Sequence, residues 1–141
     1  MTEQKGEIDR TISFLNIASR NAQVLLDQAL RPLNLNASNY YFILKIDGQT
    51  DLTQDQLFNL IHLDHSNVTR RLDQLIQLGL VTKSRSTKDG RKWQLALTGS
   101  GLALVPQIEQ AVADVNAELF HRLTPVQVQT LTVLLTQLQE E

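Results

Sequence analysis

Residues 64–98 read DHSNVTRRLDQLIQLGLVTKSRSTKDGRKWQLALT, and this stretch decides the fold because its hydrophobic period changes at Gly79. Before Gly79, apolar side chains recur every three or four residues, as in an amphipathic helix. After Gly79, Leu80–Arg85 and Trp93–Thr98 alternate with the period of two that is typical of strands. Asp89-Gly90 between them is a common hairpin-turn dipeptide. The stretch therefore predicts a helix followed by a two-stranded hairpin.

The helix before Gly79 has two different faces. On a helical wheel one arc is apolar and is formed by Val68, Leu72, Leu75 and Ile76. The opposite face carries Ser66, Arg70, Asp73 and Gln77, with Thr69 and Gln74 beside them. Such groups hydrogen-bond base edges and phosphates, and arginine is the commonest specific reader of guanine.

Three helices are expected upstream of this stretch. Apolar residues at steps of three or four predict a long helix over about 8–31. A second helix is expected over about 37–47, entered through the polar caps Asn36 and Ser38. Thr53-Gln54-Asp55-Gln56 matches a capping box for a third, short helix.

Asp64-His65-Ser66 offers an N-cap for the fourth helix, which is the amphipathic helix described above. Thr98 is expected to cap a fifth helix, which Pro106 is predicted to kink or to delay. Thr124-Pro125-Val126-Gln127 is a strong start signal for a sixth helix. A short helix, a turn, an amphipathic helix and a hairpin make a winged helix-turn-helix. The predicted fold class is mostly α with a small β-hairpin.

The basic residues are concentrated in one segment. The chain of 141 residues has a formal net charge of -2. Residues 69–92 nevertheless contain seven of the 13 basic side chains and two acidic ones, which gives this segment a net charge of +5. A basic patch on an acidic chain is typical of a polyanion binder. A solvated charged face is the simpler interpretation, and the coincidence with a winged helix-turn-helix favours DNA binding over it.

Composition excludes several other classes. The chain contains no cysteine, so disulfides, thiolate zinc sites, iron–sulfur clusters and thiol redox sensing are ruled out. It contains no apolar run of 18 residues, and its first ten residues, MTEQKGEIDR, are polar. We therefore expect neither a membrane span nor a secretory signal, and a cytoplasmic location.

Four short motifs carry a family resemblance. They are Ser66-Asn67-Val68-Thr69-Arg70, Gly79-Leu80-Val81, Asp89-Gly90-Arg91 and Leu97-Thr98-Gly99-Ser100-Gly101. Each motif is weak alone, but their combination, order and spacing resemble the MarR (multiple antibiotic resistance regulator) family over nearly the whole chain. The resemblance implies a cytoplasmic, homodimeric transcription regulator with one winged helix-turn-helix on each side.

The resemblance also implies a domain organisation. Residues 1–35 and 99–141 are expected to form N- and C-terminal dimerisation helices, and residues 36–98 the DNA-binding winged helix-turn-helix. The apolar stripes of the terminal helices support this division, because they are too long for a small winged domain to cover alone. We predict a homodimer that binds double-stranded DNA at a pseudo-palindromic site.

Residue roles follow from the same resemblance. It implies that Ser66, Asn67, Thr69 and Arg70 lie in the major groove, that Arg91 enters the minor groove, and that Asp89 helps to fix the wing. The complete set expected at the DNA is Ser66, Asn67, Thr69, Arg70, Arg71, Arg85, Lys88, Asp89, Arg91 and Lys92.

Arg71 departs from the family pattern, which has an apolar residue at this position. Two interpretations of Arg71 stay open, a phosphate contact and a snorkelling side chain. Lys88 and Lys92 are expected to be phosphate contacts.

An effector site is also implied. In this family small aromatic or anionic ligands bind between the dimerisation helices and the winged domain. Asn16 and Arg20 are candidate partners for a carboxylate, and Tyr40 or Tyr41 for stacking on the ligand. The alternative is a packed groove without a natural ligand.

Neither a metal site nor an active site is predicted. His62 and His65 are three residues apart, but the predicted turn separates them, and His121 stands alone. The chain contains no Gly-rich phosphate loop, no G-x-S-x-G elbow and no paired-carboxylate constellation. We therefore expect no cofactor, no metal and no catalytic residue.

The leading hypothesis is a sequence-specific transcription regulator that represses by covering a promoter and that a small effector releases. The alternative is a winged-helix module that binds another protein and does not read DNA. Steep salt dependence of binding to a duplex distinguishes the two.

Overall fold

The structure is a computed structural model that describes residues 2–61 and 65–139. Its elements are α1 (Thr2–Leu30), η1 (Arg31–Leu33), α2 (Tyr40–Ile46), α3 (Gln54–Leu60), α4 (His65–Gln77), β1 (Val81–Arg85), β2 (Trp93–Leu97), α5 (Gly99–Leu119) and α6 (Pro125–Gln139). The chain is mostly α with one small hairpin, which confirms the predicted fold class. The N-cap proposed at Asp64 lies outside the described residues.

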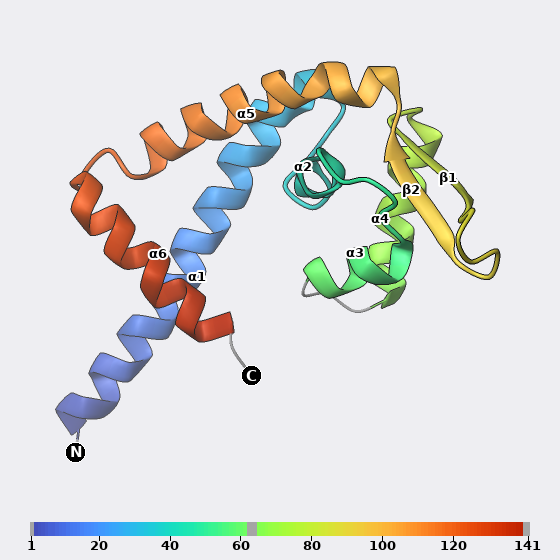
Figure 1. The fold of residues 1–141 in the computed structure, drawn as a ribbon. Coiled ribbons are helices and arrows are strands. Elements are labelled where there is room, and N and C mark those ends of the chain that lie inside the picture. The colour runs from blue at the N-terminus through green and yellow to red at the C-terminus, as the bar shows by residue number, and fades with distance from the viewer. Residues whose placement is uncertain (1, 62–64, 140–141) are drawn as a thin grey trace.

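The elements form a winged unit and a long helical arm (Figure 1). The elements α2, α3, α4 and the β1–β2 hairpin make the winged unit beneath one end of α5. The C-terminal part of α1 packs against α5, and α6 turns back from the far end of α5. The N-terminal part of α1 therefore projects away from the winged unit.

The apolar arc of α4 faces the core, as the helical wheel predicts. Val68, Leu72 and Leu75 are completely buried, and Ile76 is partly buried against the same cluster. This cluster joins all three helices of the winged unit to the hairpin and to the arm, through Leu30, Phe42, Ile43, Leu57, Leu95 and Ile108. Burial of one face of α4 leaves its other face free for a ligand.

Side-chain caps fix three helix starts as expected. Thr53 and Gln56 form a reciprocal capping box at α3, and Thr124 and Gln127 form another at α6. The Thr98 hydroxyl accepts a hydrogen bond from the Gly101 amide at 3.0 Å and caps α5. These caps satisfy amides that a helix leaves unpaired in its first turn.

The predicted start of α2 is wrong. The helix begins at Tyr40, because Asn36 and Ser38 use their polar groups in a preceding turn. The Asn36 side chain accepts from the Ser38 amide at 2.8 Å, and the Asn39 side chain accepts from the Asn36 amide at 3.0 Å. These short side chains stabilise a local turn in competition with the helix.

Of the two effects expected of Pro106, a kink or a delayed start of the helix, the delayed start is wrong. Helix α5 begins at Gly99 and includes Pro106. Pro106 and Leu102 lie on the exposed side of α5, where water can satisfy the Leu102 carbonyl that proline leaves without a donor. The Thr98 cap therefore sets the start of the helix.

The predicted hairpin is antiparallel, and it has one additional support. Val81 pairs with Leu97 and Arg85 with Trp93. The segment before α3 pairs with the other edge of β2. The Leu95 amide donates a hydrogen bond to the Leu52 carbonyl at 2.8 Å, and Thr53 forms a β-bridge with Gln94. The wing is thus attached to the loop between α2 and α3.

The long helices do not resemble membrane spans. Within residues 2–61 and 65–139, no helix combines the length and the apolar character that a membrane crossing requires.

Candidate nucleic-acid interface

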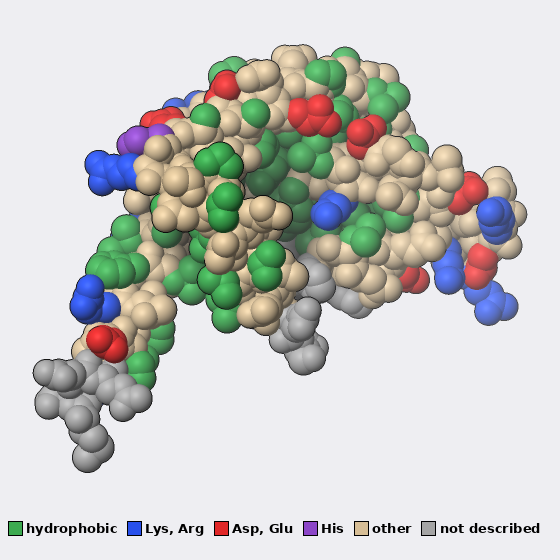
Figure 2. All heavy atoms as spheres, turned by 60° about the vertical axis from the view of Figure 1, so that its left-hand side comes forward, with side chains coloured by type: hydrophobic (Ala, Val, Ile, Leu, Met, Phe, Trp, Pro, Cys, Tyr) green, Lys and Arg blue, Asp and Glu red, His purple; other side chains and the backbone are tan. Residues whose placement is uncertain are grey.

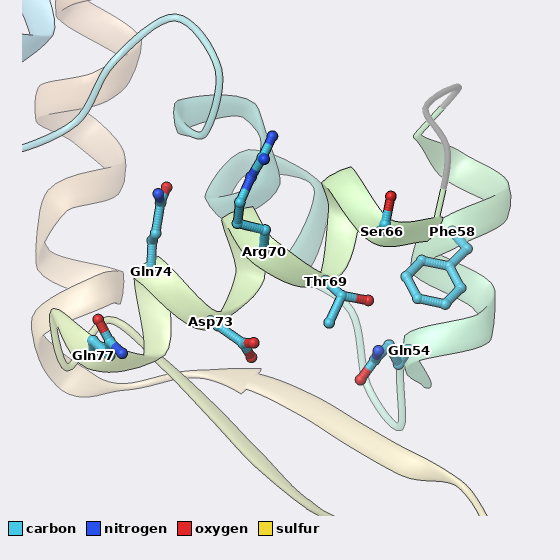
Figure 3. A pocket seen from close by; sticks show the side chains of 8 residues that line it. All are labelled: Gln54, Phe58, Ser66, Thr69, Arg70, Asp73, Gln74 and Gln77. Atoms are coloured by element: carbon cyan, nitrogen blue, oxygen red, sulfur yellow. The ribbon is translucent and has the colours of Figure 1, made fainter.

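The outward face of α4 lines a hollow of about 700 Å³ (Figure 3). Helix α4 supplies most of its walls, and α3 supplies the rest through Gln54 and Phe58. The residues from α4 are Ser66, Thr69, Arg70, Asp73, Gln74 and Gln77. The structure thus brings together three residues that sequence reasoning placed at the DNA, namely Ser66, Thr69 and Arg70.

Arg70 is held by its neighbour on the same helix. Its guanidinium donates a hydrogen bond to the Asn67 side-chain oxygen, one turn back along α4. Arg70 remains exposed, and in Figure 3 it points to the same side of α4 as Gln74. This bond restricts the rotamers of Arg70 while leaving most of its five N–H donors for a ligand.

Sequence reasoning missed the contribution of α3 to this hollow. Gln54 and Phe58 are four residues apart, so they share one face of α3. The Gln54 side-chain oxygen is buried and has no hydrogen-bond partner within the described part of the chain. The i, i+4 spacing beside the Thr53 capping box was the available signal for this face.

Arg71 is placed differently from Arg70. It is half-buried, and its guanidinium donates to the Ser38 backbone carbonyl at 3.3 Å. This bond ties α4 to the turn before α2 and so helps to orient α4.

Side-chain caps shape the tip of the wing. The Ser86 hydroxyl accepts from the amides of Lys88 and Asp89 at 3.2 and 3.3 Å. The Asp89 carboxylate accepts from the Arg91 amide at 3.1 Å. Arg91 and Lys92 are exposed just past this turn. Asp89 therefore stabilises the turn that presents Arg91.

Two basic side chains of the wing pack on Trp93, the single tryptophan of the chain. The Arg85 guanidinium lies 4.0 Å and the Lys83 ammonium 4.8 Å from the centre of its ring. Arg85 also donates to the Arg91 carbonyl at 3.4 Å. These cation–π contacts stabilise the wing and fix the position of Arg85.

A second hollow, of about 720 Å³, separates the wing from the start of α3. It contains Lys88, Asp89 and Lys92 from the wing and Asp51 from the loop between α2 and α3. Asp51 pairs with Lys88 at 3.3 Å and accepts from the Gln94 amide nitrogen at 2.9 Å.

The candidate effector residues lie on two elements, α1 and α2. Tyr40 and Tyr41 form an edge-to-face pair with ring centres 5.6 Å apart, whereas Asn16 and Arg20 are exposed on α1. Two smaller hollows lie between α5 and α6 and beside η1. The four hollows named here are lined by other residues.

Tyr40 has a perturbed environment. Burial, together with the neighbouring Tyr41 hydroxyl, raises the pKa of Tyr40 above its ordinary value near 10.0. The Tyr40 hydroxyl therefore stays protonated at neutral pH and can donate a hydrogen bond.

Among the described residues no three His, Asp or Glu side chains are grouped as metal ligands. His121 contacts the Glu118 carbonyl through Nδ1 at 2.8 Å, which makes it a C-terminal cap of α5.

Comparison with known proteins connects this geometry with a family. Residues 35–93, which contain α4 and most of the wing, match the model of the MarR family. The resemblance that the four sequence motifs carry is thereby confirmed.

Solved structures of MarR regulators share the fold over nearly the whole chain. A mutant MarR from E. coli complexed with operator DNA is 28% identical, with a TM-score of 0.85 over 95% of this chain and 96% of that one. The apo form of wild-type E. coli MarR is also 28% identical, with a TM-score of 0.73 over 91% and 96%. A probable transcriptional regulator from Pseudomonas aeruginosa, 23% identical, has a TM-score of 0.83 over 93% and 98%. The last of these similarities concerns the fold alone.

Proposed function

We propose that this chain is a sequence-specific DNA-binding transcription regulator that acts as a homodimer and represses by covering a promoter. One observation carries the proposal. The exposed face of α4 presents Ser66, Thr69 and Arg70 in a single hollow beside a basic wing. A similar structure, with a TM-score of 0.85, is that of a mutant E. coli MarR complexed with operator DNA, and this supports DNA binding by the present chain.

The chemistry of α4 suits the major groove of DNA. That groove admits an α-helix, and a guanidinium can bond both acceptors of a guanine edge. Arg70 is exposed and is oriented by Asn67, so it loses less conformational freedom on binding. Ser66 and Thr69 provide hydroxyls for neighbouring bases or phosphates. We assign base reading to these four residues of α4.

The chemistry of the wing suits the backbone and the minor groove. Arg91 is exposed at a turn that Asp89 and Ser86 stabilise, so its long side chain projects from a fixed base. A narrow minor groove has a strongly negative potential and attracts arginine. We assign Arg91 to the minor groove and Lys92 to phosphate, while Arg85 and Arg71 serve chiefly to position the wing and α4.

Dimerisation would cover the exposed apolar surface of the arm. Large apolar side chains on α1 and α6 are exposed, as the hydrophobic patches of Figure 2 show. They include Ile8, Ile12, Phe14, Leu15, Ile17 and Val24 on α1 and Val126, Val133, Leu134 and Leu138 on α6. Contiguous exposed apolar surface of this kind marks an interface. We propose residues 1–35 and 99–141 as the dimerisation region and residues 36–98 as the DNA-binding region.

An effector would act by changing how the DNA-binding region is oriented relative to the dimerisation region. A small aromatic or anionic molecule releases DNA only if it binds the DNA-incompetent arrangement more tightly. Arg20 and Asn16 on α1 offer polar partners, and the Tyr40–Tyr41 pair offers aromatic surface. The proposed activity requires no catalytic group and no cofactor, and it is expected in the cytoplasm.

Selection of bound duplexes from a random-sequence pool tests the proposal. We expect enrichment of a pseudo-palindrome whose half-sites are about 10 base pairs apart, or a multiple, because a two-fold dimer presents two recognition helices at that repeat. Absence of any enriched sequence would contradict it and would favour the protein-binding alternative.

A further inference from the structure

Asp51 connects the wing with the segment before α3. One carboxylate oxygen lies 3.3 Å from the Lys88 ammonium at the tip of the wing. The other accepts from the Gln94 side chain at 2.9 Å, within β2. A single side chain thus holds the wing at two points.

The backbone gives this carboxylate a defined position. Asp51 has a φ of 56°, a left-handed conformation that residues other than glycine rarely adopt and that persists only where the surroundings hold it. The next two residues are fixed along β2, through the Leu95–Leu52 hydrogen bond and the Thr53–Gln94 bridge. The Asp51 carboxylate is therefore attached to the backbone segment that is hydrogen-bonded to β2 and supports the wing.

The ion pair between Asp51 and Lys88 is weak enough for Lys88 to change partners. The Lys88 side chain is 78% exposed and that of Asp51 52%, and exposed ion pairs are weak. A DNA phosphate can therefore replace Asp51 as the partner of Lys88. A lysine that already has a carboxylate partner releases fewer counterions on meeting DNA, so its contribution to sequence-independent affinity is reduced.

We propose that Asp51 is a positioning residue that holds the wing in place in the free protein, a role that we call the latch. By pairing with Lys88 it also keeps this lysine from contacting phosphates, and it thereby weakens non-specific DNA binding. This inference rests on the proposed DNA-binding function. When specific DNA binds, the Lys88 ammonium exchanges the carboxylate for a phosphate, while Gln94 keeps its bond to Asp51. On random DNA, Lys88 keeps the carboxylate as its partner. Asp51 thereby increases the preference for specific over random DNA, although it is not assigned to any base.

The first experiment measures binding to a scrambled duplex at several salt concentrations. Asp51→Asn removes the charge but keeps an acceptor for Gln94, and asparagine tolerates the left-handed backbone. We expect about threefold tighter binding and a salt slope steeper by about 0.9, the increment for one phosphate. Asp55→Asn removes the same charge from the first turn of α3, where it pairs with no wing residue in the described structure, and is expected to change the slope little.

A control in a second variant distinguishes loss of the Asp51–Lys88 ion pair from a change in the net charge of the protein. In a chain that carries Lys88→Met, Asp51→Asn is expected to leave the slope unchanged. An equal gain in that background, or with Asp55→Asn, would show a general charge effect and would overturn the proposal. A wild-type chain without salt-dependent duplex binding would instead overturn the proposed function, and this role of Asp51 with it.

The latch in the free protein is measured without DNA. Nitrogen-15 relaxation reports the backbone order of residues 86–92. We expect Asp51→Ala, which removes both bonds, to lower this order more than Asp51→Asn does. If the backbone order of residues 86–92 is unchanged in Asp51→Ala, the proposal that Asp51 holds the wing in place is overturned.

Discussion

At the scale of single residues, Arg70 and Arg91 have different tasks although both are exposed arginines. Arg70 lies on the face of α4 that is proposed to meet base edges. Arg70→Ala is therefore expected to cost about 1–3 kcal/mol of binding free energy and to relax the preference at one base position. Competition between duplexes that differ at single bases measures both effects. A uniform loss over all positions would assign Arg70 to phosphate instead.

Arg91 is expected to act with little regard to sequence. Arg91→Ala should weaken binding to many duplexes, lower the salt slope by about one, and cost most affinity where flanks rich in A·T pairs narrow the minor groove. Arg122→Ala is the matched control, because Arg122 is an exposed arginine in the turn between α5 and α6, away from the wing. If neither Arg70→Ala nor Arg91→Ala changes the affinity, this chain does not read DNA through its winged helix.

Tyr40 predicts a pH dependence of stability. Burial raises the pKa of Tyr40 in the folded chain above the value near 10.0 that the unfolded chain retains. The contribution of the protonated hydroxyl is fully present below that pH and is lost as pH rises through the folded pKa. Tyr40→Phe should therefore flatten the fall in unfolding free energy above about pH 10, measured by urea denaturation. An identical fall in wild type and variant would exclude Tyr40 as its source.

At the scale of the elements, the packing of α5 on the hairpin depends on Gly101. A β-carbon at this buried position would clash with the backbone carbonyl of Leu80, which cannot rotate away. Gly101→Ala is expected to destabilise the fold by about 1–3 kcal/mol. Gly99→Ala, one residue into the same helix, meets nothing and is expected to be neutral or slightly stabilising. Thermal unfolding of both variants at one protein concentration tests the contrast.

Local sequence patterns were enough to predict α4 and the hairpin. The period of 3.6 before Gly79 gave α4 and its buried arc, and Asp89-Gly90 gave the hairpin. The start of α2 was predicted wrongly, because Asn36 and Ser38 have the composition of helix caps but close a turn instead.

Contacts between distant residues could not be predicted in this way. Asp51 meets Lys88 and Gln94 only because the loop before α3 lies along β2. Arg85 and Trp93 stack because the strand register places them opposite each other, a pairing that the turn length alone leaves open. These long-range contacts convert a predicted basic hairpin into a wing with a defined orientation.

At the scale of the whole molecule, the exposed arm requires a partner. We predict a homodimer whose interface buries about 2,000 Å² or more in total. Ile12→Asp should dissociate it, because Ile12 is 57% exposed on α1 among other apolar side chains. Leu78→Asp changes a similarly exposed leucine just after α4 and should leave the dimer intact. Sedimentation of both variants at micromolar concentration measures the difference, and a monomeric wild type would contradict the prediction.

The central claim is that this dimer reads a specific DNA sequence through α4 and the wing. The most direct measurement is the dissociation constant of the full chain for a selected duplex and for its scrambled version, by fluorescence anisotropy from about 50 to 200 mM salt. The account predicts a linear fall of log affinity with log salt for both duplexes, and an affinity for the selected duplex that is about a thousandfold or more higher. Equal affinity for the two duplexes, or affinity that does not depend on salt, would contradict it.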